Sequence, residues 1–160
     1  MSVLIRAMRP EDARSFLEIH HAAVRGIAAK DYPPSVVEVW AQPITDEVIE
    51  RFLANGDQEV RLVAEIDDQP VGIGAIVIGN SELRACYVSP IAARRGVGSA
   101  LVAEIERIAR EHHLDRLQLE SSITAEPFYS ALGYEVEARR EFLLAPGVPM
   151  AAVQMRKRLL

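Results

Sequence analysis

The sequence predicts an α/β fold in which a mixed, mostly antiparallel sheet of about seven strands is flanked by helices. β-rich runs at 59–66, 70–78 and 81–89 follow one another across short turns, which favours antiparallel pairing. Apolar residues spaced by three and four before and after these runs predict amphipathic helices. Because 160 residues suffice for one hydrophobic core, we expect a single domain over 1–160.

The composition narrows the function classes. The chain is 49% hydrophobic and 26% charged, which is typical of a soluble globular protein. Its 18 basic and 23 acidic residues argue against a general nucleic-acid binder. No apolar run approaches the roughly 20 residues that cross a bilayer, and the first residues, MSVLIRAMRPEDAR, carry charges where a signal peptide has its apolar centre. We therefore expect a cytoplasmic protein without a membrane partner.

The first part of the chain predicts one strand and three helices. Residues 3–8 form the expected strand, and Pro-Glu-Asp at 10–12 marks a helix start with the right charge for the helix dipole. Apolar residues then recur at helical spacing through Ile27. Further helices are expected at 31–41, where prolines fit a turn and a first helical position, and at 45–56, between a capping threonine and Asn-Gly.

The stretch SPIAARRGVGSAL, residues 89–101, joins a strand to a helix. The first-turn amides of a helix lack partners within the helix and, with the helix dipole, attract anions. Gly96 and Gly98 leave room for a bulky pyrophosphate, and Arg94 and Arg95 add positive charge. The turn therefore predicts a phosphate site, with a plain strand-to-helix turn and two solvated arginines as the alternative.

Two known nucleotide motifs fit this turn less well. A P-loop ends in Gly-Lys-Ser/Thr, and no lysine follows these glycines. A dinucleotide site needs GxGxxG/A, whereas the third position here is Leu101, and the turn follows antiparallel strands. Glu120 lies about 20 residues later, where a ribose-binding acid is expected, so the dinucleotide alternative stays open.

The remaining residues predict a strand, a short helix and two closing strands. Residues 114–121 carry alternating apolar positions, and the helix is expected from about Thr124 until Gly133 closes it. The final strands are expected at 134–145 and 150–160.

With these elements in place, the chain resembles the GNAT superfamily, the acyl-CoA-dependent N-acyltransferases. The resemblance spans nearly the whole order of elements and is most specific in CYVSPIAARRGVGSALV and LQLESSITAEPFYSALGYEV. DYPPSVVEVWA and SITAEPFY are also similar to a bacterial subgroup of acetyltransferases known as YafP-like. The resemblance implies a GNAT fold splayed between the fourth and fifth strands, acetyl-CoA as co-substrate, a small-molecule or protein amine as acceptor, and a homodimer.

The resemblance also assigns the cofactor-binding residues. The CoA pyrophosphate is expected in the turn, and the pantetheine arm is expected along the exposed backbone of the strand before it. The residues assigned are Cys86, Tyr87, Val88, Arg94, Arg95, Gly96, Val97, Gly98, Ser99 and Thr124. Ala93 and Arg94 depart from the family's Gln/Arg-Gly opening, and Thr124 replaces an asparagine, but the family's phosphate contacts come mainly from backbone amides. Arg94 in place of a glycine requires a backbone conformation that a residue with Cβ accepts.

For catalysis, an attacking amine must lose a proton and the leaving thiolate must gain one. The resemblance places Tyr129 at the general-acid position, where a phenol with a pKa of about 10 is protonated at neutral pH, while packing beside Phe128 is the alternative. Glu82 stands where one branch of the family carries its base and is expected to act through a water; a solvated strand end is the alternative, and Glu120 is the reserve candidate. Strand alternation predicts a shared face for Glu82, Arg84, Cys86 and Val88.

No metal site is expected. Cys86 is the only cysteine, and the adjacent pairs His20–His21 and His112–His113 lack the i, i+4 spacing of a helical metal pair. Tyr32 and Trp40 fall in the region that covers the acceptor, either as an aromatic wall for a cationic amine or as ordinary packing. A non-catalytic CoA- or nucleotide-binding module remains the second hypothesis for function.

Overall fold

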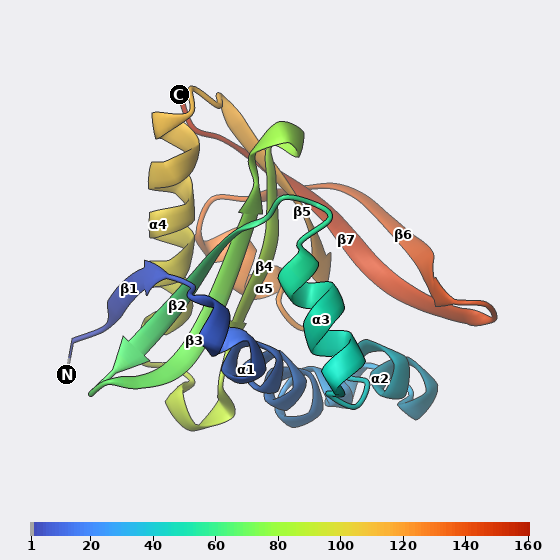
Figure 1. The fold of residues 1–160 in the computed structure, drawn as a ribbon. Helices are drawn as coiled ribbons and strands as arrows, with labels where there is room; N and C mark the ends of the chain where they lie inside the picture. The colour runs from blue at the N-terminus through green and yellow to red at the C-terminus, as the bar shows by residue number, and fades with distance from the viewer. Residues whose placement is uncertain (1) are drawn as a thin grey trace.

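The computed structural model describes residues 2–160 and contains a seven-stranded sheet (Figure 1). The strands lie in the order β1-β2-β3-β4-β5-β7-β6, and every neighbouring pair is antiparallel except β4 and β5. Their bounds are β1 Leu4–Ala7, β2 Val60–Ile66, β3 Gln69–Val77, β4 Glu82–Val88, β5 Arg116–Ser122, β6 Glu135–Ala145 and β7 Val148–Arg158. The predicted mixed, mostly antiparallel sheet of seven strands is confirmed.

Helices cover both faces of this sheet. Their bounds are α1 Ala13–Gly26, α2 Pro34–Trp40, α3 Asp46–Ala54, α4 Val97–Glu111 and α5 Glu126–Ala131. Figure 1 shows α4 on one side of the sheet and α1, α2 and α3 on the other. Helix α5 begins at Glu126 rather than at Thr124, and Gly133 follows its end with a left-handed φ of 95°. No helix within residues 2–160 is long and apolar enough to cross a membrane.

Apolar side chains hold α4 against the middle of the sheet. Leu101 and Ile105 are fully buried in one cluster with Leu117 of β5. Gly72 of β3 permits this close approach, because a Cβ there would lie 2.7 Å from a methyl carbon of Val97. The amino end of α4 is therefore fixed beside the end of β4.

A second set of apolar contacts holds the other helices. Phe16 and Ile19 of α1 pack with Ile73 of β3, and Val36 of α2 packs with Met150 of β7. Helix α1 thus covers the strands on one side of the sheet's centre, and α2 reaches the strands on the other side.

Strands β4 and β5 separate almost as soon as they meet. Their pairing is confined to Glu82 and Gln118 within residues 2–160, and the amide of Gln118 donates to the carbonyl of Ser81 over 2.9 Å. Beyond this point the backbone edge of β4 that faces β5, including 86–88, has no neighbouring strand. The predicted splay between the fourth and fifth strands is confirmed.

A β-bulge in β4 corrects one expectation. Ala75 of β3 pairs with Ala85, but Ile76 pairs with Leu83, which leaves Arg84 as an extra residue. Leu83 packs on the α4 side, as does Cys86, so the alternation of side chains inverts between them. The prediction of one shared face is wrong, because the bulge places Glu82 on the opposite face of the sheet from Cys86 and Val88.

Candidate active site

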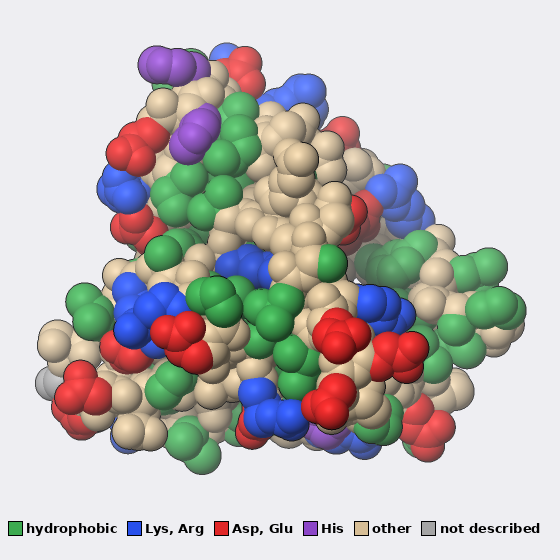
Figure 2. Space-filling view, viewed as in Figure 1, with side chains coloured by type: hydrophobic (Ala, Val, Ile, Leu, Met, Phe, Trp, Pro, Cys, Tyr) green, Lys and Arg blue, Asp and Glu red, His purple; other side chains and the backbone are tan. Residues whose placement is uncertain are grey.

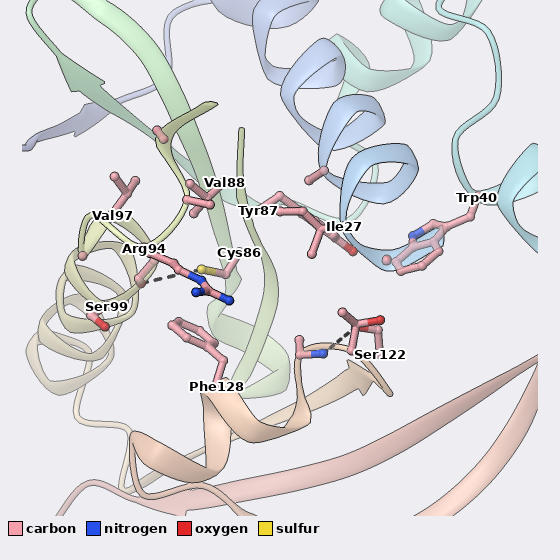
Figure 3. A pocket seen from close by; sticks show the side chains of 18 residues that line it. Ile27, Trp40, Cys86, Tyr87, Val88, Arg94, Val97, Ser99, Ser122 and Phe128 are labelled. Atoms are coloured by element: carbon pink, nitrogen blue, oxygen red, sulfur yellow. Dashed lines mark hydrogen bonds between the residues drawn. The ribbon is translucent and has the colours of Figure 1, made fainter. Parts of the chain in front are cut away.

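A cavity of about 380 Å³ opens between the amino end of α4, the free edge of β4, the end of α1 and the segment from β5 to α5; we call it the turn cavity (Figure 3). Figure 3 shows Arg94 and Ser99 toward one end of this space and Trp40 toward the other. Nine of the ten predicted cofactor-binding residues line it: Cys86, Tyr87, Val88, Arg94, Gly96, Val97, Gly98, Ser99 and Thr124. The tenth, Arg95, does not.

The turn presents backbone amides at one end of the turn cavity. Gly96 has a φ of 80° and precedes the first residue of α4. Within residues 2–160 no side chain caps this helix. Its first backbone hydrogen bond is donated by the amide of Ala100 to the Gly96 carbonyl over 3.0 Å. The amides at 97–99 precede that hydrogen bond, so they are available to an anion.

Arg94 has a strained backbone in this turn. Its φ of 63° lies in the left-handed region, which costs a residue with Cβ roughly 1 kcal/mol. The side chain is exposed and borders the turn cavity. The turn therefore does not give Arg94 the unstrained backbone that the sequence analysis required of a residue with Cβ.

The floor of the turn cavity combines β4 with the start of α4. The Cys86 thiol donates to the carbonyl of Gly98 over 3.7 Å, and burial raises the pKa of this thiol to about 12. A Cβ at Gly98 would lie 3.0 Å from the Phe128 ring, so glycine permits α4 and α5 to approach here. Cys86 therefore packs as a protonated thiol rather than as a nucleophile.

Tyr129 lies on α5 next to Phe128, which lines the turn cavity. Its ring is buried and contacts Phe128 and Tyr134 edge-on, at centroid distances of 5.0 and 5.8 Å. Burial raises the pKa of Tyr129 well above its usual value, so the phenol stays protonated. The Tyr129 hydroxyl has no hydrogen-bond partner among residues 2–160, and the single fully enclosed polar side-chain atom without a partner in this range is Nε of Arg6. The hydroxyl therefore keeps a free donor, although Tyr129 does not line the turn cavity.

Aromatic rings close the other end of the turn cavity. Trp40 and Tyr87 both line it and contact each other edge-on at a centroid distance of 6.4 Å. His20 packs behind them, 4.6 Å from the Tyr87 ring, and burial lowers its pKa to about 4. Trp40 thus provides part of an aromatic wall, whereas Tyr32, which contacts Trp40 at 5.5 Å, is buried and does not line the turn cavity.

Hydrogen bonds from the segment after α1 reach the splayed strand. The Tyr32 hydroxyl donates to the Ala151 carbonyl over 2.7 Å and accepts from the Ile123 amide over 2.8 Å. Thr124 donates its hydroxyl to the Asp31 carboxylate over 2.6 Å. These bonds supply the end of β5 with partners that β4 does not provide, and so they hold the turn cavity open.

Glu82 borders a separate depression of about 200 Å³, which we call the polar hollow. Its lining residues are Glu82, Gln118, Leu119, Glu120, Arg140 and Gln154. Both Glu82 carboxylate oxygens accept hydrogen bonds from Arg84 over 2.9 Å. The structure therefore brings Glu82 and Glu120 to one depression, but it does not place Glu82 against the turn cavity.

Several lining residues were not among the site residues assigned from the sequence. They come from separate elements and are mostly small or apolar: Ala23, Ile27, Ala28, Ala92, Ala93, Ser122, Ala125 and Phe128. Such residues match ordinary core positions, so residue type alone gave no signal. The proximity of Phe128 to the predicted acid was the available hint.

Comparisons with known proteins agree with this architecture. A family model described as an acetyltransferase (GNAT) domain matches residues 28–158. The uncharacterized N-acetyltransferase YafP of Escherichia coli (strain K12) is 31% identical over 134 residues, covering 84% of this chain and 82% of that protein.

Two solved structures share the fold over almost the entire chain. The GCN5-related N-acetyltransferase (Aminotransferase, Class-II) from Rhodopseudomonas palustris superposes with a TM-score of 0.90 at 26% identity, covering 99% of this chain and 96% of that one. The PaiA N-acetyltransferase from Thermoplasma acidophilum, in complex with coenzyme A, superposes with a TM-score of 0.76 at 23% identity, covering 99% of each chain.

The resemblance stated from the sequence, including that to YafP-like acetyltransferases, is thereby confirmed. The uncapped helix α4 and the free edge of β4, which bound the turn cavity, lie within the residues that the family model matches. The chain belongs to the GNAT family and is an acyl-CoA-dependent N-acetyltransferase that takes an amine acceptor.

Proposed function

We propose that the protein transfers an acetyl group from acetyl-CoA to a primary amine by direct attack. One observation carries the proposal: the unbonded amides at the start of α4 and the free edge of β4 border the same turn cavity. The amides and Arg94 suit a pyrophosphate, and a strand edge suits the amide groups of a pantetheine arm. The CoA bound to the Thermoplasma acidophilum relative supports this choice of donor.

In this mechanism the amine nitrogen attacks the thioester carbonyl carbon, and the C–S bond breaks as the tetrahedral intermediate collapses. The amine proton passes through a water to a carboxylate, and the thiolate takes a proton from the hydroxyl of Tyr129. A raised pKa weakens this phenol as an acid, but the same apolar surroundings also raise the basicity of a thiolate. Burial raises the pKa of the Cys86 thiol next to the turn cavity in the same direction.

Glu82 is the carboxylate that we propose as the base, acting through a water. It lies on the face of the sheet opposite α4 and at the point where β4 and β5 diverge. Its two hydrogen bonds from Arg84 hold the carboxylate in place, so a water must reach a remaining lone pair. Glu120 borders the same polar hollow and remains the reserve candidate.

The first experiment is calorimetric titration with acetyl-CoA, CoA and NAD⁺, followed by thiol release against a panel of amines. Selective CoA binding in the micromolar range, about −8 kcal/mol, and amine-dependent thiol release are expected. Preference for NAD⁺, or no CoA binding, would contradict the proposal. CoA binding without thiol release would instead favour the non-catalytic binding module.

The base is tested separately by the pH–rate profiles of Glu82→Gln and Glu120→Gln. Glu82→Gln is expected to lower the rate about 100-fold and to remove the acidic limb of the profile. If that limb persists in Glu82→Gln and is lost in Glu120→Gln, the base is Glu120.

A further inference from the structure

The polar hollow lies on the face of the sheet opposite α4, and four strands build it. Gln118 sits beside Glu82, Glu120 pairs with Gln154, and Arg140 pairs with Ala152, the residue opposite Ser122. Paired residues share a face, so these side chains project to one side while Leu117 and Leu119 face α4. Figure 2 shows a recess beside the green β6–β7 hairpin, with acidic and basic side chains along its border.

The polar hollow adjoins the turn cavity along β5. Glu120 borders the polar hollow, and Ser122, the next residue on the same face, lines the turn cavity. One step along a strand between residues of the same face is about 7 Å. A ligand in the polar hollow therefore lies next to the place where a thioester in the turn cavity would end.

Each of the two carboxylates that line the polar hollow has an arginine partner. Glu82 is paired with Arg84, and Glu120 is paired with Arg140. The Arg140 side chain is 52% exposed and that of Glu120 is 36% exposed. An ion pair this exposed contributes little to stability, so a ligand can separate it at little cost.

The ion pair between Glu120 and Arg140 determines which ligands can bind without leaving a charged side chain unpaired. An ammonium ion that took Glu120 would leave Arg140 without its partner, and a lone carboxylate that took Arg140 would leave Glu120 without one. A molecule with both groups replaces one ion pair with two charge-assisted ones. The side-chain amides of Gln118 and Gln154 add neutral donors and acceptors beside the charges.

We propose that the polar hollow binds the acceptor and that the acceptor is an amino acid, with its amine held at Glu120 and Glu82 and its carboxylate at Arg140. This assignment rests on the proposed acetyl transfer. Arg140 is then a specificity-determining residue, and Glu120 positions the amine that Glu82 deprotonates through a water. The bound ammonium releases one proton to solvent before attack, and the proton that the neutral amine loses on acyl transfer passes through a water to Glu82, so the carboxylate remains the charged anchor throughout the reaction.

The experiment compares matched acceptors that differ only in the carboxylate: L-phenylalanine with 2-phenylethylamine, and L-leucine with 3-methylbutylamine. Thiol release from acetyl-CoA gives kcat and KM, and calorimetry gives the CoA affinity of each variant. Each amino acid is expected to exceed its partner amine at least 10-fold in kcat/KM, which corresponds to about 1.4 kcal/mol. Arg140→Gln is expected to remove this preference by raising KM for the amino acid and lowering KM for the plain amine, for which Glu120 is then free. Its CoA affinity is expected to match wild type, because Arg140 does not line the turn cavity.

Arg140→Lys and Arg107→Gln complete the set. Arg140→Lys keeps the charge and is expected to retain part of the preference. Arg107 pairs with Glu104 and Glu111 on the exposed side of α4 and lines neither depression. Arg107→Gln is therefore expected to retain the full preference for amino acids.

The outcomes separate this inference from the proposed function. Preference for the plain amines, or a preference for amino acids that survives in Arg140→Gln, overturns the assignment while acetyl transfer stands. Failure to bind CoA overturns the proposed function itself. CoA binding with no thiol release from any of these acceptors counts against both.

Discussion

The turn cavity and the polar hollow lie next to each other but are lined by different kinds of chemical groups. The turn cavity is lined by backbone and by small or apolar side chains, and Arg94 is its only charged lining residue within the described chain. The polar hollow is lined almost entirely by charged and amide side chains. The first depression suits a large ligand held by backbone groups, and the second suits a small ligand recognised by individual side chains.

The difference also predicts how each depression responds to substitution. Changes of volume or of backbone conformation should act on the turn cavity, because its contacts come from the shape of the chain. Changes of charge should act on the polar hollow, as the Arg140 variants test. The four predictions below probe the turn cavity and its aromatic end in decreasing order of expected effect.

Tyr129→Phe is expected to lower kcat about 100-fold and to leave the CoA affinity unchanged, because it removes a proton donor but no volume. Stopped-flow thiol release and calorimetry measure the two quantities. Tyr134→Phe is the matched control: the Tyr134 hydroxyl donates to the buried Glu106 carboxylate over 2.9 Å, so its loss should lower stability rather than kcat. Equal rates for wild type and Tyr129→Phe would remove the acid assignment.

Gly98→Val is expected to weaken CoA binding about 30-fold, or about 2 kcal/mol. The added side chain meets the Phe128 ring, which is already 3.0 Å from an ideal Cβ, and projects where a ligand approaches the backbone. Calorimetric titration measures the loss. Gly79→Ala is the control, because a Cβ there has open space, and an equal loss in both variants would show that the effect is general.

His20 is expected to make the protein less stable in mild acid. An unfolded histidine takes up a proton below about pH 6.5, whereas burial keeps the pKa of His20 at about 4 in the folded chain. Because the unfolded state binds more protons between these values, the free energy of unfolding falls by about 2 kcal/mol as pH drops from 6.5 to 4. That stability is fully present above pH 6.5.

Urea unfolding of His20→Phe across this pH range is the measurement. The variant is expected to lose less stability than wild type between pH 6.5 and 4. The same substitution at the exposed His112 is the matched control. If wild type and His20→Phe lose stability equally, His20 does not cause the acid sensitivity.

Arg94→Gly is expected to have the smallest effects, and they have opposite signs. Release of the left-handed strain should raise the free energy of unfolding by about 0.5 to 1 kcal/mol. Loss of the cation should weaken CoA binding about threefold, and less at high salt. A variant that loses stability would show that the Arg94 side chain contributes more to the fold than its backbone costs.

The turn cavity was largely predictable because its key residues are contiguous. Gly96, Gly98 and the helix start at Val97 carry a local signal, and the strand before them must end at the same place. Thr124 was assigned by resemblance and lines the turn cavity, yet its hydroxyl bonds Asp31. No local pattern of residues indicates that bond, because Thr124 and Asp31 are far apart in the chain.

The face of Glu82 was mispredicted for a different reason. Alternation along β4 is a sound rule until an extra residue enters the strand, and the bulge at Arg84 arises from pairing with β3. The sequence of β4 alone cannot reveal which of its residues is left without a partner in β3.

By itself, the sequence determined the elements and the strand-to-helix turn before α4, because hydrophobic period, capping residues and glycines act over short distances. The family followed from the resemblance of its motifs to those of GNAT proteins. Only the tertiary structure decided that β7 inserts between β5 and β6 and thereby brings Glu120, Gln154 and Arg140 together. Charged residues on the exposed face of a strand show the same polar–apolar alternation whatever the position of that strand in the sheet. Their meeting in the polar hollow depends on strand order, which is set by packing across the whole sheet.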